Sequence, residues 1–226
     1  MTRHLPVLAG AATAAMVVAG LMIFVYAPAD ALEGDVQRIF YLHVSTAIGA
    51  YVAFTTVAVG GILYLWRESR VADRIAVAAA EVGLLFTTIT LVMGSLYGKA
   101  IWGTYWTWDA RLTSTLVLWM MYAAYILVRR IATPGRQAAR FAAVVGIIGA
   151  LDIPVVHFSV NWWRTQHPQS VLTAPGGPAL PAAMLITFFV TFAATLLLGL
   201  VLVLVRYRIE ATGESVAITL EERQAA

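Results

Sequence analysis

Six long runs of apolar residues, separated by short polar stretches, dominate this chain. Each run approaches or exceeds the roughly 20 residues that a helix needs to cross the hydrocarbon core of a bilayer. In lipid each segment must satisfy its own backbone hydrogen bonds, so runs this long and this apolar are helices. The sequence therefore predicts an all-α polytopic membrane protein, with residues 1–226 forming one domain of six transmembrane helices. The apolar runs lie near residues 6–27, 41–66, 75–97, 112–128, 141–160 and 181–205.

Basic residues in the connections predict the orientation of these helices. If the six spans alternate in direction, one side of the membrane has Arg38, Lys99, Arg111 and Arg164. Because lysine and arginine concentrate in cytoplasmic connections, we expect both termini in the cytoplasm and connections one, three and five on the outer face. The remaining eleven of the fifteen basic residues lie on the cytoplasmic side: Arg3, Arg67, Arg70, Arg74, Arg129, Arg130, Arg136, Arg140, Arg206, Arg208 and Arg223.

The first apolar run has some features of a secretory signal peptide. Arg3 precedes it, and Ala29-Asp30-Ala31 follows it like a small-residue cleavage site. At about 22 residues, however, the run is longer than the apolar core of about 7–15 residues in such peptides. We therefore expect an uncleaved first helix, and a purified chain that starts at Leu32 would contradict this expectation.

Composition supports the membrane assignment and excludes several classes of function. Hydrophobic residues make up 61% of the 226 residues and charged residues only 12%, against about 25% charged in soluble domains. The net charge of +3 comes from arginines in short connections, so we interpret it as a topology signal and expect no nucleic-acid binding. The chain has no cysteine, which excludes disulfides, thiolate metal sites and covalent haem attachment through cysteine.

Tryptophans collect in the connections predicted to face outward. Trp102, Trp106 and Trp108 lie in the third connection, and Trp162 and Trp163 lie in the fifth. An interfacial belt is one explanation, because indole rings favour the headgroup zone. A belt decorates both membrane faces, whereas the excess here is one-sided. The dense polar run within the connection 98–111 is instead typical of a surface that stacks on a flat ligand.

Two histidines are predicted to lie at the same outer depth of the membrane. His43 is near the start of the second helix and His157 is near the end of the fifth. Two neutral imidazoles from different helices can bind a haem iron from its two faces. Either histidine alone is better explained as a hydrogen-bonded interfacial residue, and the presence of both at one depth weakens that explanation. His4 and His167 are interpreted as solvated, with His167 a reserve candidate.

Charged residues near this region suggest supporting roles. Arg111, which follows Trp108-Asp109, is the best candidate to pair with a haem propionate. Asp109 is expected to cap the N-terminus of the fourth helix. Lys99 and Arg38 are interpreted as ordinary charges that flank a helix.

Two acidic residues fall inside the predicted spans, where their cost makes them functional hypotheses. Asp152 precedes His157 by about one helical turn, where it can support the orientation of a ligand. Glu81 lies in the cytoplasmic half of the third helix, where pairing with a neighbouring arginine is the simpler explanation.

Sequence patterns of hydrolytic enzymes are missing. Residues Gly94 to Ala100 resemble a phosphate-binding loop, but one residue is lacking between the glycines and Ala100 stands where Ser or Thr must reach magnesium. The chain has no Ser-His-Asp, His-Glu-x-x-His or paired-carboxylate arrangement. We therefore expect a binding protein and not an enzyme.

The motifs together resemble a known family, the haem-handling proteins of cytochrome c maturation, and most closely their six-helix CcmC family. The resemblance rests on three outward regions. Residues 102–114 read Trp-Gly-Thr-Tyr-Trp-Thr-Trp-Asp-Ala-Arg-Leu-Thr-Ser, like the tryptophan-rich signature of that family. Residues 38–43 read Arg-Ile-Phe-Tyr-Leu-His, and residues 154–163 read Pro-Val-Val-His-Phe-Ser-Val-Asn-Trp-Trp. The number of predicted helices also matches over the whole chain.

This resemblance implies a site and a set of partners. It implies that His43 and His157 are axial ligands of a b-type, non-covalently bound haem in transit, and that Trp102, Trp106, Trp108 and Asp109 form its platform. It further implies a bacterial inner-membrane protein that presents haem on the periplasmic side to a CcmE-type haem chaperone. The ABC-transporter subunits CcmA and CcmB and the small membrane protein CcmD are the other implied partners.

Two other functional classes remain as alternatives. A membrane b-type cytochrome that passes electrons predicts histidines deep within the spans, usually enough for two haems. A haem-translocating permease predicts polar residues along a central path, for which the spans offer Glu81 and Asp152.

Overall fold

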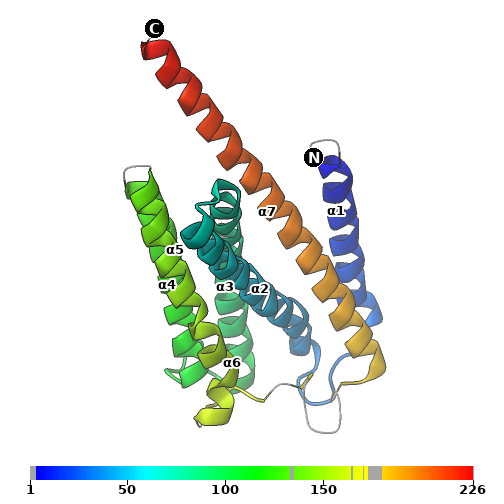
Figure 1. Cartoon of the computed structure of the whole chain (residues 1–226). Coiled ribbons are helices and arrows are strands. Elements are labelled where there is room, and N and C mark those ends of the chain that lie inside the picture. The colour runs from blue at the N-terminus through cyan, green and yellow to red at the C-terminus, as the bar shows by residue number, and fades with distance from the viewer. Residues whose placement is uncertain (1–3, 133–134, 164, 170, 173–179, 226) are drawn as a thin grey trace.

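The computed structural model describes residues 4–132, 135–163, 165–169, 171–172 and 180–225, and side chains up to Gly213. Its elements are helices joined by short connections (Figure 1). They are α1 (Leu5–Leu21), a π-helical turn (Met22–Tyr26), a 3-10 turn (Asp35–Gln37), α2 (Arg38–Arg67), α3 (Arg70–Trp102), α4 (Ala110–Ile131), α5 (Arg136–Ala150), α6 (Asp152–Trp162) and α7 (Ala182–Ala225).

The prediction of six transmembrane helices is confirmed. Within the described residues, six helical segments are long and apolar enough to cross a membrane. The fifth consists of α5 and α6 together, which meet at Leu151. The six segments are Leu5–Tyr26, Asp35–Arg67, Arg70–Trp102, Ala110–Ile131, Arg136–Trp162 and Ala182–Gly213.

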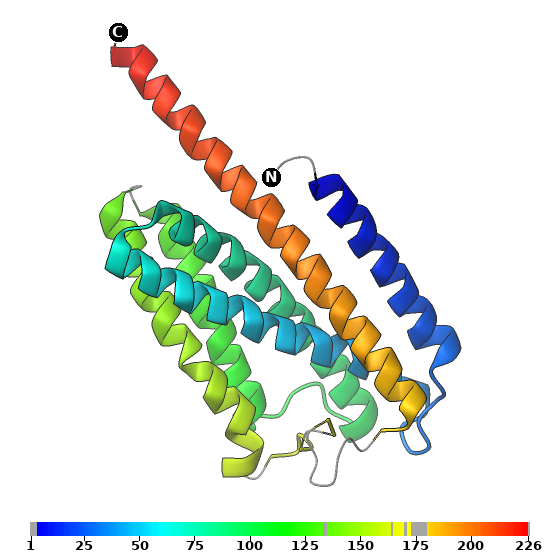
Figure 2. The ribbon, with the colours of Figure 1, turned by 45° about the vertical axis from the view of Figure 1, so that its right-hand side comes forward.

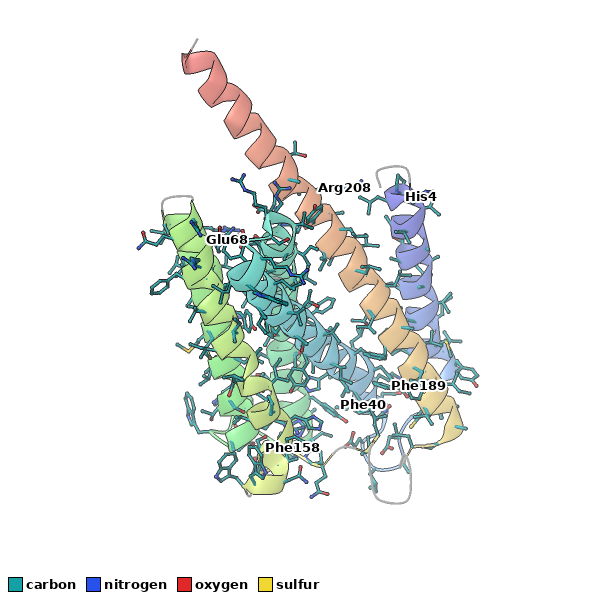
Figure 3. The ribbon with its side chains drawn as sticks, in the orientation of Figure 1. His4, Phe40, Glu68, Phe158, Phe189 and Arg208 are labelled. Carbon is teal, nitrogen blue, oxygen red and sulfur yellow. The ribbon has the colours of Figure 1, made fainter. Side chains whose placement is uncertain are left out.

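The bundle has two chemically different ends. Both chain termini lie at one end, and α6 lies at the other (Figure 1). Figure 3 shows His4, Glu68 and Arg208 at the end with the termini, and Phe40 and Phe158 at the opposite end. We call the latter the tryptophan end, because the connection from Trp102 to Trp108 also lies there. Placement of both termini at one end agrees with an even number of spans.

Helices α2 and α3 form the centre of the bundle, and α7 crosses it beside α1 (Figure 2). Small residues let α2 and α3 approach closely. A Cβ atom on Gly60 would lie 2.9 Å from the carbonyl oxygen of Ala72, and one on Gly83 would lie 2.4 Å from the Phe54 ring. Close backbone contact of this kind is how membrane helices pack without a hydrophobic driving force between them.

Side chains form hydrogen bonds with backbone groups at the ends of several helices. Ser69 accepts a bond from the Ala72 amide at the start of α3, and Asp109 accepts one from the Leu112 amide at the start of α4. The predicted cap at Asp109 is therefore confirmed. Arg38, interpreted from the sequence as a flanking charge, donates to the carbonyl oxygens of Ile23 and Ala27 and so satisfies the end of the first span.

Ion pairs join helices at the end with the termini. Arg206 of α7 pairs with Glu81 of α3, and Arg130 of α4 lies 3.8 Å from the same carboxylate. Arg129 of α4 pairs with Asp73 of α3 at 2.9 Å. The expectation that Glu81 pairs with a neighbouring arginine is confirmed, and the cost of a carboxylate in this span is offset by these arginines.

Candidate functional site

The connection from α3 to α4 is a short, ordered segment at the tryptophan end. α3 ends at Trp102, and Gly103 follows with a left-handed φ of 74°, a conformation that glycine adopts without steric cost. Lys99 donates to the carbonyl oxygen of Gly103 at 2.8 Å. This lysine therefore closes the C-terminus of α3, which agrees with its interpretation as a charge that flanks a helix.

Hydroxyl groups hold the rest of the connection in place. Thr104 donates to the carbonyl oxygen of Trp106 at 3.0 Å, and Thr107 donates to the second carboxylate oxygen of Asp109 at 3.0 Å. Asp109 thus joins the connection to the start of α4. These local bonds hold the backbone that carries the indoles.

The indoles of this connection are partly open to their surroundings. The Trp108 side chain is 78% exposed, whereas Trp106 is half-buried and packs edge-on against it with ring centroids 5.7 Å apart. The Nε1 atom of Trp106 is buried and has no hydrogen-bond partner among the described residues. An exposed ring beside an unused donor suits contact with a flat ligand that has polar edges.

His43 lies in the second turn of α2, half-buried against α3. Its Nδ1 atom is 3.1 Å from the carbonyl oxygen of Thr90. A carbonyl oxygen only accepts hydrogen bonds, so this contact places the imidazole proton on Nδ1 and leaves the lone pair on Nε2. Histidines that bind metals use this arrangement, with the second ring nitrogen donating to a carbonyl or carboxylate.

His157, the other predicted ligand, lies in α6 with an exposed side chain. Its ring packs edge-on against Phe158 at 4.8 Å between centroids. Phe158 in turn stacks on Trp162, and Trp162 lies 5.7 Å from Trp163. The predicted ligands Trp162 and Trp163 therefore form one exposed aromatic row with His157, along α6 and its C-terminal end.

His167 is only partly exposed, whereas the sequence-based interpretation was a solvated side chain. Its ring lies 6.2 Å from the Trp102 ring, and its Nδ1 atom is 3.1 Å from the carbonyl oxygen of Pro168. The structure therefore places His167 beside the tryptophan connection, with its Nδ1 on a backbone carbonyl as in His43.

Arg111 connects the elements of this region. Its guanidinium donates to the carbonyl oxygen of His157 at 2.7 Å and lies 3.5 Å from Nδ1 of His167. Its Nε atom is buried without a partner among the described residues. Arg111 thus positions α6 and the following connection, and keeps one donor free for an anionic group such as a carboxylate.

Asp152 and Arg164 are two further residues that the sequence analysis named. Asp152 is the first residue of α6, and its Oδ2 atom is buried without a partner among the described residues. Its support of His157 stays a prediction. Arg164 lies outside the described residues. Among those that are described, no three His, Asp or Glu side chains gather as a site for a metal ion.

The environment of His167 leads to a testable pH dependence. Burial, and then the positive charge of Arg111, lower the pKa of His167 below its ordinary 6.5. Arg111→Gln is expected to raise this pKa, since it removes the repulsion between the two cations. NMR titration of the imidazole measures the change, with Arg38→Gln as a control that removes another arginine at the tryptophan end. An unchanged or lower pKa in Arg111→Gln would contradict the assigned contact.

The same shift has a consequence for stability. Because the folded protein holds His167 neutral, the unfolded chain binds a proton more readily below pH 6.5. The stability that this residue contributes is therefore present above that pH and is lost as the pH falls below it.

A family model described as heme exporter protein C matches residues 1–220. Heme exporter protein C of Bradyrhizobium diazoefficiens is 38% identical over 209 residues, which cover 92% of this chain and 79% of that protein. Heme exporter protein C of Escherichia coli K12 is 40% identical over 166 residues, 74% of this chain and 68% of its own length. A putative cytochrome c biosynthesis ccmC-like mitochondrial protein of Marchantia polymorpha is 36% identical over 168 residues, 74% of this chain and 71% of its own length.

Proposed function

The chain belongs to the heme exporter protein C (CcmC) family, and from this membership we propose that it binds haem at the tryptophan end and presents it to a periplasmic haem chaperone. The family handles haem in cytochrome c biogenesis and is not a family of catalytic enzymes. Our proposal adds the site, the side of the membrane and the acceptor.

One observation carries the proposed site. His43 and His167 each have Nδ1 at 3.1 Å from a backbone carbonyl oxygen. The Thr90 carbonyl therefore sets the His43 imidazole to offer Nε2 to iron, the arrangement that metal-binding histidines use. For His167 the Pro168 carbonyl, which lies closer to Nδ1 than the Arg111 guanidinium at 3.5 Å, favours the same arrangement. The ring of His157 has the aromatic neighbour Phe158 instead. We accordingly propose His43 and His167 as the axial pair, and the pair His43 and His157 predicted from sequence is the arrangement to test against it.

Charge distribution supports a periplasmic position for this site. The end with the termini has the arginines of the α2–α3 connection, of the C-terminus of α4 and of the middle of α7, among them Arg67, Arg130 and Arg206. Basic residues concentrate on the cytoplasmic side of bacterial inner-membrane proteins. Both termini are therefore proposed to be cytoplasmic, with the tryptophan end in the periplasm.

The proposed mechanism is presentation of a cargo, without a covalent step on this chain. Trp102, Trp106, Trp108 and Asp109 form the platform, with Trp162 and Trp163 at its border. Indole faces cover the porphyrin, and the free Nε donor of Arg111 pairs with a propionate. Because Trp108 is largely exposed, the site stays open on one side. Haem held there by side chains alone can pass to an acceptor protein.

The partners are proposed from the resemblance of the motifs. A CcmE-type haem chaperone is the acceptor, and CcmA, CcmB and CcmD are the membrane partners. The redox alternative fits less well, because a b-type cytochrome subunit places its histidines deep in the spans. Here His43 is in the second turn of α2 and His167 lies in the connection after α6.

Coexpression with a CcmE-type chaperone tests the function. The wild-type chain is expected to increase the fraction of chaperone that carries haem. With the His43→Ala chain, this fraction is expected to equal the background found when the chaperone is expressed alone. Immunoblots of membrane fractions control for the amount of each variant. A wild-type chain that binds haem without loading the chaperone, but exchanges electrons with a quinol, would support the redox alternative.

A further inference from the structure

The imidazole of His43 packs on the surface of α3, at a site formed by two residues that lie one helical turn apart. Thr90 provides the carbonyl oxygen, 3.1 Å from Nδ1. Gly94 provides the space: a Cβ atom there would lie 2.9 Å from Cε1 and 3.4 Å from Nδ1 of His43. The first distance is shorter than any that a Cβ atom normally tolerates. Any side chain at position 94 therefore competes directly with the ring.

The geometry of an α-helix explains why the glycine is one turn after the carbonyl. The carbonyl of residue 90 points along the axis toward residue 94, whose amide it accepts. Side chains tilt toward the N-terminus, so a side chain at position 94 covers the turn at position 90. A helical carbonyl thus becomes accessible to an outside donor where the residue four positions later has no side chain.

We propose that Gly94 is a positioning residue of the haem site: by leaving the Thr90 carbonyl uncovered, it fixes the His43 imidazole with the proton on Nδ1 and Nε2 free for iron. This inference rests on the proposed function for the role of His43. Gly94 itself does not touch the cargo in this proposal. Its contribution is the tautomer and the ring orientation of the ligand, which in metal sites depend on the hydrogen bond of the second nitrogen.

A second contact fixes the register of α2 against α3 at this site. The hydroxyl groups of Thr46 and Thr90 lie 2.9 Å apart, so one of them donates to the other, and the accepting hydroxyl donates its own proton to a carbonyl one turn back in its helix. Thr46 follows His43 by three residues and therefore lies near it on the same face of α2. The hydrogen bond between the threonines prevents α2 and α3 from sliding past each other at the depth of the imidazole.

The next turn of α3 repeats the arrangement for an indole. A Cβ atom on Gly98 would lie 3.2 Å from the Trp102 ring and 3.3 Å from the carbonyl oxygen of Thr104. Gly94 and Gly98 are four residues apart and share one face of α3. This face thus leaves space for an imidazole and then for an indole. The segment that resembles a phosphate-binding loop in sequence is accordingly continuous helix whose glycines make room for side chains.

Gly94→Ala tests the inference, with Gly60→Ala as the matched control. Gly60 packs α2 on α3 at the opposite end, where its Cβ would meet the Ala72 carbonyl oxygen at the same 2.9 Å. Haem is titrated into each purified full-length variant, and the absorbance and electron paramagnetic resonance spectra are recorded. Gly94→Ala is expected to weaken haem binding about 10- to 100-fold, the usual loss when the support of a metal ligand is disturbed, and to alter the axial-ligand signature. Gly60→Ala is expected to leave both unchanged.

A double variant determines whether the effect passes through His43. If it does, adding Gly94→Ala to His43→Ala causes no further loss of haem affinity. Additive losses would overturn the inference, as would wild-type affinity and spectra in Gly94→Ala. Wild-type ligation in His43→Ala would instead overturn the proposed role of His43, and the inference with it. Loss in His43→Ala together with none in Gly94→Ala refutes only the inference.

A measurement on the unaltered protein avoids any folding defect of the variants. Nitrogen NMR of the haem-free chain with labelled histidine is expected to show His43 as the neutral tautomer that is protonated on Nδ1. His43→Gln identifies its signals by their disappearance. A neutral His43 protonated on Nε2 would overturn the inference, because the Thr90 carbonyl would then have no proton to accept.

Discussion

Replacing His43 or His167 by alanine is expected to abolish six-coordinate haem binding, whereas replacing His157 leaves the axial ligation unchanged. The first two imidazoles have Nδ1 on a backbone carbonyl and so offer Nε2. His157 has an exposed ring beside Phe158. Mutating a residue that supports a metal ligand lowers the affinity for the metal by at least about tenfold. Loss of the ligand itself should lower the haem affinity by more than that. Absorbance spectra and haem titrations of the three purified variants measure the effect.

The three single variants serve as controls for one another. Each removes one imidazole from the tryptophan end, so a general effect of alanine would appear in all three. Retention of low-spin haem by His167→Ala, with loss in His157→Ala, would restore the pair predicted from the sequence. Retention in all three would refute a bis-histidine site at this end.

Gly83→Val is expected to destabilise the helical bundle by about 3 kcal/mol or more, the upper range for overpacking a core. A Cβ atom at position 83 would lie 2.4 Å from the Phe54 ring. Phe54 cannot move away easily, because its other face stacks on Tyr122 at 3.6 Å between centroids. The hydroxyl of Tyr122 also donates to the Gly146 carbonyl oxygen at 2.9 Å, so the strain passes from α3 through α2 and α4 to α5.

Thermal unfolding of the detergent-solubilised variant measures this loss. Gly20→Val in α1 is the matched control, because no atom lies within 4 Å of the Cβ position there. Equal melting temperatures for the two variants would show that the Phe54 ring is free to move, contrary to the packing described above.

Local features of the site could be predicted from the sequence. Asp109 was predicted to cap α4, and it does so through the amide of Leu112, three residues later. Glu81 was predicted to pair with an arginine, but its partner Arg206 is 125 residues away in the sequence. A cap depends on neighbours in the chain, whereas an ion pair between helices depends on how they pack. The partner of a helix cap can therefore be predicted from the sequence, whereas the partner of an ion pair between helices cannot.

The role assigned to His167 shows the limit of sequence analysis most clearly. The residue lies in a polar connection without periodicity, so nothing local distinguished it from a solvated histidine. Its position four residues after Trp162-Trp163 was the available signal, since it placed an imidazole beside the aromatic excess. Its neighbours Arg111 and Trp102 come from α4 and the end of α3. Gly94 was similarly overlooked, because its importance depends on a ring from another helix.

The sequence by itself determined the six spans, the concentration of arginine opposite the tryptophans, and the family to which the chain belongs. Hydrophobicity, charge and motifs are properties of neighbouring residues, and a bilayer acts on them one segment at a time. Only the tertiary structure decided that a carbonyl of α3 meets the His43 imidazole, that Arg111 and Trp102 lie beside His167, and which glycines make room for neighbouring rings. Those contacts join residues that are distant in the chain, and their geometry exists only after the helices have packed.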